Sequence, residues 1–169
     1  MTKNKKTGFT LLELLIALVI AGVLIGYGIP AYRNFSIRQN ISNHANDFLT
    51  DINLARISAL DLSRNVGLQR IGNSWSRGWN VFVDVNDDGV FNAADDTLLR
   101  LHQTFSTTSN ATGNIELVGS DVTVLFNNQG SLVGINVFSM GVSHSGLTYN
   151  VDVNVALSGM ATTVSHETT

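Results

Sequence analysis

The chain has 169 residues, a formal net charge of −3 and no cysteine. Its length suits one globular domain with an additional helix, and its hydrophobic content of 44% excludes a wholly disordered chain. The lack of cysteine excludes a disulfide framework, a thiol nucleophile and a Cys-rich zinc site, and the acidic balance gives no general attraction to nucleic acid.

The first thirty residues combine a basic start with a long apolar segment that contains one acid. The basic start holds three lysines, Lys3, Lys5 and Lys6. The apolar segment runs from Phe9 to Ile29 and is long enough, at about 1.5 Å per residue, to cross roughly 30 Å of hydrocarbon. The acid, Glu13, costs on the order of a few kcal/mol in lipid, which indicates a functional role. The lysines predict a cytoplasmic leader and a translocated C-terminal body.

Three interpretations of this segment are open. A secretory signal peptide would be cut on the far side of the apolar run, near residues 26–31. A simple membrane anchor needs no cut, but it leaves Glu13 without a role. A cut between Gly8 and Phe9 would make Glu13 the fifth residue of the mature chain, and we favour this interpretation.

The favoured interpretation agrees with a known family. Residues 3–15, Lys-Asn-Lys-Lys-Thr-Gly-Phe-Thr-Leu-Leu-Glu-Leu-Leu, closely resemble the class III leader and helix start of type IV pilins and type II secretion pseudopilins. The resemblance implies that prepilin peptidase cuts after Gly8 and N-methylates Phe9. It also implies that Glu13 contacts the N-terminal amine of a neighbouring subunit during filament assembly. An amine is the kind of cation that a carboxylate in lipid requires.

The helical pattern continues beyond the apolar segment. Apolar residues recur at spacings of three and four: Ile37, Ile41, Ala45, Phe48, Ile52, Ala55, Ala59 and Leu62. The opposite face is expected to carry Arg38, Asn43, Asp47, Asp51 and Arg64. We therefore predict one helix from Phe9 to about Ser63, with a membrane and assembly part (9–30) and an amphipathic part (31–65).

The middle of this helix contains residues that weaken helices: Gly22, Gly26, Gly28 and Pro30. Two uses are open. Neighbouring helices could pack closely through the pair Gly22 and Gly26, or the region could be a weak point that stretches in a filament.

From Val66 onward the pattern changes to short apolar runs separated by turn residues. Seven strands are predicted: Val66–Ile71, Trp79–Val85, Thr97–His102, Asn114–Val118, Val122–Phe126, Leu132–Phe138 and Leu147–Leu157. The predicted fold is α+β, with a long N-terminal helix packed on an antiparallel β-sheet head (66–169), as in pilins. Residues 1–8 would be the leader peptide.

The segment from Gly78 to Arg100 narrows the family and suggests a metal site. It resembles the hairpin of the FimT/GspH group of minor pilins and pseudopilins, with an aromatic strand, an acidic turn and a final Leu-Arg. The turn also follows the calcium-loop spacing, with candidate ligands Asp84, Asn86, Asp88, the Val90 carbonyl, Asn92 and Asp95. The alternative is a hairpin whose Asp and Asn side chains bond their own backbone. The final aspartate, shorter than the usual glutamate, and the strand-like flanks favour this alternative.

No catalytic residues are predicted. The four histidines, His44, His102, His144 and His166, are scattered through the sequence without ligand spacing, and no hydrolytic triad is apparent.

Members of the FimT group that bind DNA carry an arginine-rich element near the C-terminus, whereas this chain has no lysine or arginine after Arg100. The remaining basic candidates for DNA binding are Arg64, Arg70, Arg77 and Arg100.

The resemblance implies a structural subunit, a minor pilin or pseudopilin, that assembles into a type IV pilus or a type II secretion pseudopilus after cleavage by prepilin peptidase. Before assembly it would cross the inner membrane once and carry a periplasmic head. Its partners would be other pilins or pseudopilins and the peptidase. Two alternatives are a DNA-binding minor pilin for natural transformation and an adhesive module at the pilus tip.

Overall fold

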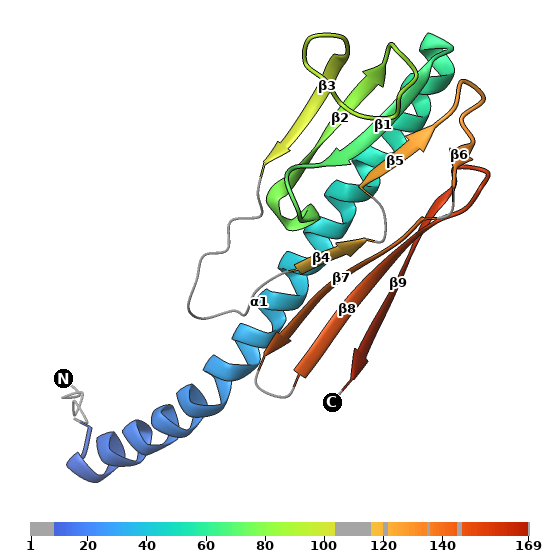
Figure 1. The fold of residues 1–169 in the computed structure, drawn as a ribbon. Coiled ribbons are helices and arrows are strands. Elements are labelled where there is room, and N and C mark those ends of the chain that lie inside the picture. Colours follow the sequence, from blue (N-terminus) through green and yellow to red (C-terminus); the bar gives the residue numbers. More distant parts are fainter. Residues whose placement is uncertain (1–8, 104–115, 120–121, 135, 145–146, 169) are drawn as a thin grey trace, which may run out of the picture. The chain divides into compact units, whose positions relative to one another are not determined.

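The computed structural model describes residues 9–103, 116–119, 122–134, 136–144 and 147–168. The chain divides into two compact units between Ser36 and Ile37, and each is described here by itself. Residues of the first unit are helical from Leu11 onward, and the second unit contains the rest of this helix together with all strands. Figure 1 shows the order of the elements along the chain.

The long helix α1 (Leu11–Leu62) has 52 residues and agrees with the predicted helix. It ends where Ser63 adopts a left-handed backbone conformation, with φ of 51°. The next amide, that of Arg64, then donates to the Ala59 carbonyl at 3.3 Å, so the chain turns out of the helix at this point.

The strands form two antiparallel sheets. The first sheet has the order β3-β2-β1-β5-β6 and the second has the order β4-β7-β8-β9. The first contains β1 (Asn65–Arg70), β2 (Gly78–Asp84), β3 (Thr97–Gln103), β5 (Thr123–Phe126) and β6 (Leu132–Val133). The second contains β4 (Glu116–Gly119), β7 (Asn136–His144), β8 (Leu147–Val155) and β9 (Ala161–Thr168). A short 3-10 helix, η1 (Trp75–Arg77), lies between β1 and β2.

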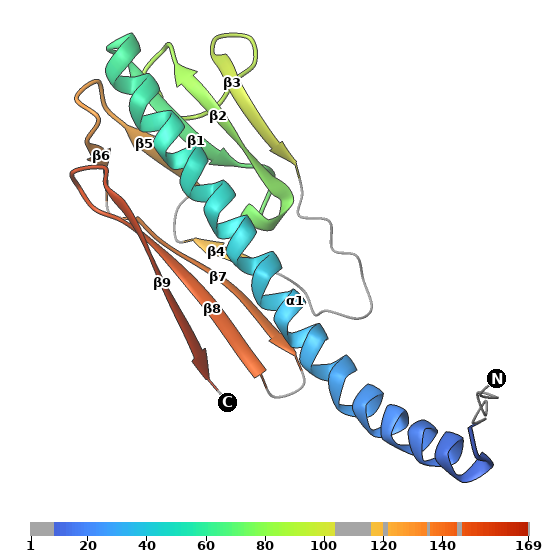
Figure 2. The same cartoon turned by 180° about the vertical axis from the view of Figure 1, so that it is seen from behind.

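One stripe of α1 forms the core of the head together with residues of both sheets. The predicted apolar positions from Ile37 to Ala59 are at most 1% exposed. They form one cluster with residues of the first sheet, such as Val66 and Leu68, and of the second, such as Val151 and Val153. In Figure 1 strands β1 and β5 of the first sheet lie in front of α1, and in Figure 2 α1 lies in front of them, so the first sheet covers one side of this part of the helix.

The predicted α+β class is confirmed, but the strand assignment differs in two places. The expected strand Leu132–Phe138 is two strands, because Gly134 has φ of 103° and the chain passes there from the first sheet to the second. Strand β9 was not predicted, since the Thr- and Ser-rich segment Ala161–Thr168 lacks an apolar alternation. The predicted start of a strand at Asn114 lies outside the described residues.

Candidate functional site

The N-terminal end of α1 carries the residues predicted for processing and assembly. Thr10 precedes the helix, and its side-chain oxygen accepts a hydrogen bond from the Glu13 amide at 3.3 Å. Glu13 is the third residue of α1, so Thr10 and Glu13 have the spacing of a capping box. The positive end of the helix dipole stabilises a carboxylate at this position. Gly8 lies outside the described residues, and Phe9 is 86% exposed.

The first part of α1 exposes apolar side chains all around the helix. Its large apolar residues from Leu11 to Ile29 are between 49% and 84% exposed. Among the described residues, α1 is the one helix that is long and apolar enough, by length and composition, to cross a membrane. A surface that is apolar on every side is stable in lipid or among other apolar helices, but not in water.

Within the part of the chain that the structure describes, the glycines of this segment face open space. A methyl group at Gly22, Gly26 or Gly28 would meet nothing within 4 Å. The helix also continues through Pro30. Both predicted uses of these residues, close helix packing and a weak point, therefore concern the assembled state and stay predictions.

The acidic loop between β2 and β3 uses its side chains to bond its own backbone. The buried Asp84 carboxylate accepts from the amides of Asp88 at 3.2 Å and Gly89 at 2.9 Å. Asp96 accepts in the same way from the amides of Val85 and Asn92. Burial raises the pKa of Asp84, and the two amide hydrogen bonds act against this rise. These contacts are the ones expected for a hairpin whose Asp and Asn side chains bond their own backbone. They give no support to a bound calcium ion.

The remaining predicted calcium ligands take part in the same local network. Asn86 accepts from the Asp88 amide, Asp88 from the Val90 amide, and Asn92 from the Ala94 amide. The Asn92 side-chain amide also donates to Asp95 at 2.8 Å. Hydrogen bonds between neighbouring residues thus account for the Asp- and Asn-rich composition of the loop.

The four arginines proposed for DNA binding are not all gathered in one place. Arg64 directly precedes β1 and Arg70 ends it, so the two are about 20 Å apart along the backbone at roughly 3.3 Å per residue. Arg77 lies in η1, and Arg100 lies in β3 with its guanidinium 2.6 Å from the Asp51 carboxylate. Charge neutralisation by Asp51 further weakens the predicted basic patch.

A buried polar cluster joins α1 to β2 and β3, and the sequence analysis did not find it. Asp51 was expected on the polar helix face, but it is only 1% exposed. Its carboxylate accepts hydrogen bonds from Trp79 Nε1 at 2.8 Å and from Arg100 at 2.6 Å. His102 stacks on Trp79, with 4.1 Å between ring centroids and 5° between planes, and its Nδ1 is 3.6 Å from Asp51. These contacts compensate the burial of the Asp51 charge.

Beside this cluster, His44, Asp47 and His102 form a group that could hold a metal ion. One potential ligand atom from each residue lies within 4.8 Å of the other two. The description of the histidines as scattered was therefore wrong for His44 and His102. Burial lowers the pKa of His44, the charge of Asp47 partly opposes this shift, and His102 adds to it. The only sequence signal was the spacing of three between His44 and Asp47, which places them on one helix face.

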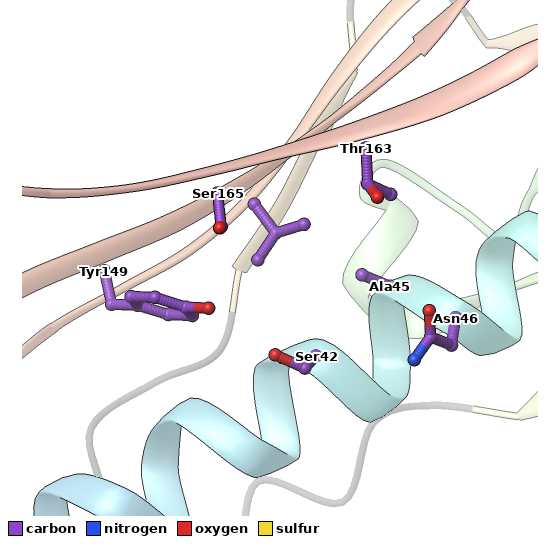
Figure 3. Close-up of a pocket in the computed structure, with 7 residues that line it drawn as sticks. Ser42, Ala45, Asn46, Tyr149, Thr163 and Ser165 are labelled. Atoms are coloured by element: carbon purple, nitrogen blue, oxygen red, sulfur yellow. The ribbon is translucent and has the colours of Figure 1, made fainter.

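Two pockets of the head are lined in part by α1. A pocket of about 290 Å³ adjoins the histidine group and is lined by Asp47, Thr50, Asp51, Arg100, Leu101 and His102. A second pocket, of about 170 Å³, lies between α1 and strands β8 and β9. Figure 3 shows hydroxyl-bearing residues such as Ser42 and Ser165 around it. Its seven lining residues include no carboxylate, imidazole or basic group, so it lacks the means for acid–base or metal chemistry.

Comparisons with known proteins agree with the long helix and the β head. Two crystal structures of the type IV minor pilin FimU from Pseudomonas aeruginosa (strain PAO1) are similar in fold. The first has a TM-score of 0.58 and 18% sequence identity, and the match covers 76% of this chain and 90% of that one. The second, in another space group, has a TM-score of 0.55 and 18% identity, with 73% and 91% covered.

Two family profiles match the sequence itself. The prokaryotic N-terminal methylation motif matches residues 3–28, and the family described as type II transport protein GspH matches residues 44–159. Together with the apolar helix, the motif is typical of inner-membrane prepilins that assemble into pili, and such proteins are structural and not enzymatic. The chain therefore belongs to the GspH family, as a pseudopilin or minor pilin with an N-terminal methylation motif.

Proposed function

We propose that this protein is a filament subunit that is cut between Gly8 and Phe9 and enters a pilus or pseudopilus through the first part of α1. The observation that carries the proposal is the exposed apolar surface from Leu11 to Ile29, with one acid near its end. Lipid can cover this surface before assembly, and the equivalent helices of neighbouring subunits can cover it afterwards.

Glu13 sets the position of the subunit in the filament. Its carboxylate lies in the first turn of α1, close to the new N-terminus that the cut at Phe9 would create. A methylated terminal amine of the next subunit carries a positive charge, and a carboxylate–ammonium contact is strong where water is excluded. The pairing fixes how far one helix can slide along another, because any other position leaves Glu13 in lipid without a cation.

The experiment that tests this proposal compares intact masses and N-terminal sequences from sheared filaments and from membranes. The wild-type chain should begin at methylated Phe9 in both fractions. Glu13→Ala should be processed in membranes but depleted from filaments. The matched control is Asp61→Ala, which removes an exposed acid from the other end of the same helix and should leave assembly unchanged. A mature chain that begins near residues 26–31, or an uncut chain never found in filaments, would contradict the proposal.

Two narrower roles can be tested on the same protein. The calcium prediction for residues 84–95 requires that calcium ions bind and that Asp95→Ala weakens their binding. Calorimetry with calcium chloride would detect both.

The DNA-binding alternative requires affinity for duplex DNA that falls steeply with rising salt concentration and with loss of Arg70 and Arg77. The distance between Arg64 and Arg70 and the pairing of Arg100 with Asp51 support a structural subunit over this alternative.

A further inference from the structure

We propose that His44, Asp47 and His102 form a binding site for a divalent transition metal ion, of which zinc is the representative. The site is separate from the acidic loop and from the assembly segment. It would connect α1 to β3, the edge strand of the first sheet.

The geometry brings three ligands from two elements to one point. His44 and Asp47 are three residues apart on α1, so their side chains are neighbours on the helix surface. His102 comes from β3, where its partner across the β2–β3 pair is Trp79. The potential ligand atoms lie within 4.8 Å of one another. A tetrahedral zinc site needs them about 3.3 Å apart, so closure requires shifts on the order of 1 Å.

The donor set selects the class of metal. Two imidazole nitrogens and one carboxylate oxygen suit zinc and its neighbours in the transition series, whereas calcium prefers an all-oxygen shell. The side chains can also make the required shift. Asp47 is exposed and His44 and His102 are half-buried, so none of the three is locked in the centre of the core.

The surroundings of His102 are those of a supported metal ligand. Its ring lies flat on the buried Trp79 ring, which fixes the plane of the imidazole. Its Nδ1 is 3.6 Å from the Asp51 carboxylate, which places this acid as an outer partner behind the histidine. Carboxylates in this second position orient histidine ligands and raise their basicity. Asp51 also binds the Arg100 guanidinium, so the arginine charge is balanced before a cation enters.

Three protein ligands leave a fourth coordination position open. The pocket of about 290 Å³ shares Asp47 and His102 with the site, so water can reach this position. A bound ion would link the edge strand to the helix in the folded state and not in the unfolded chain. The head should therefore be more stable when the ion is bound.

The test uses the full chain in detergent, without a histidine tag, and zinc chloride as the probe. Calorimetry should show one ion bound per chain, and zinc should raise the melting temperature. His44→Gln and His102→Gln should each weaken binding by more than about tenfold, since loss of even an outer partner of a metal site costs 10- to 100-fold. The matched control is His166→Gln, which removes a half-exposed histidine on β9, near Asp152 but outside the group. It should bind as the wild type does.

Asp47→Asn covers the case in which a histidine variant fails to fold. Asp47 is exposed, so this substitution should leave folding intact and still weaken zinc binding severalfold. Cobalt in place of zinc should give the visible absorption of a tetrahedral site, and this absorption should be lost in the same variants. Absence of zinc binding at millimolar concentration, or equal loss in His166→Gln, would overturn the proposal.

Discussion

Asp51 shows how a single residue can be placed wrongly when its partners are remote in sequence. An acid on a helix is normally assigned to the solvent face. Here the tertiary structure supplies Trp79 Nε1 and the Arg100 guanidinium, 28 and 49 residues away, and these donors make burial acceptable. Arg100 is half-exposed, so solvent screens part of its charge, and the Trp79 hydrogen bond is the more deeply buried of the two.

The first prediction concerns Asp51. Asp51→Ala removes the acceptor of two hydrogen bonds, one from a buried indole, and should lower the free energy of unfolding by roughly 1–3 kcal/mol. Asp61→Ala, an exposed acid on the same helix, should change it by less than about 0.5 kcal/mol. Urea unfolding of the two variants beside the wild type measures the difference. Equal losses in both variants would show that the buried hydrogen bonds do not stabilise the head.

The second prediction separates the acids of the β2–β3 loop. Asp84 is buried and accepts from two backbone amides, whereas Asp95 is exposed and accepts from the Asn92 side chain. In the presence of a calcium chelator, Asp84→Ala should therefore lower the free energy of unfolding by about 1–2 kcal/mol. Asp95→Ala should lower it much less. Chemical unfolding monitored by tryptophan fluorescence provides the comparison. A similar cost for both substitutions would mean that the local hydrogen bonds do not define the loop.

At the scale of elements, periodicity predicted the helix well and the sheets only in part. The buried stripe from Ile37 to Ala59 follows from spacing alone, because helical neighbours are local in sequence. The division into two sheets depends on the backbone conformation at Gly134. The pattern of apolar residues does not predict this conformation. Strand β9 lies at an edge and carries mostly exposed hydroxyl residues, so it has no alternation to detect.

The third prediction tests the turn between β8 and β9. Gly159 has φ of 79°, and a Cβ atom there would clash with the Gly130 carbonyl oxygen in the β5–β6 turn. An alanine in a left-handed backbone conformation lowers the free energy of unfolding by roughly 1–2 kcal/mol. Gly159→Ala should lower it by more than this, because the new methyl group also clashes. Gly134→Ala is the matched control, because it shares a positive φ but would meet nothing within 4 Å. Thermal unfolding should rank Gly159→Ala as the less stable variant, and the reverse order would contradict the contact between the turns.

The candidate sites also differ in how far apart their residues lie in the sequence, and this decides which of them could be predicted. The processing motif and Glu13 form one continuous segment, so the sequence alone was enough to propose them. The group of His44, Asp47 and His102 depends on the register of β2 and β3, which shifts between Val81 and Phe82. Such a shift changes which residues of β3 face the helix, and alternation along a strand cannot reveal it.

At the scale of the whole molecule, the two units differ in what stabilises them. The first unit, up to Ser36, exposes most of its apolar side chains and needs lipid or other subunits. The second unit, from Ile37, contains its own core, which joins one helix stripe to both sheets. Membrane insertion and assembly therefore belong to one unit, and a stable fold belongs to the other.

This division gives the fourth prediction. A fragment of residues 37–169 should be soluble without detergent and should unfold in one cooperative transition, because the buried cluster from Ile37 to Val155 lies within it. Circular dichroism during heating and gel filtration measure both properties. A second fragment that begins at Ala45 would lack Ile37 and Ile41, two fully buried residues of α1, and should be less stable by several kcal/mol. If the two fragments melt together, the first turns of this helix part do not stabilise the head, and the head core would begin later than Ile37.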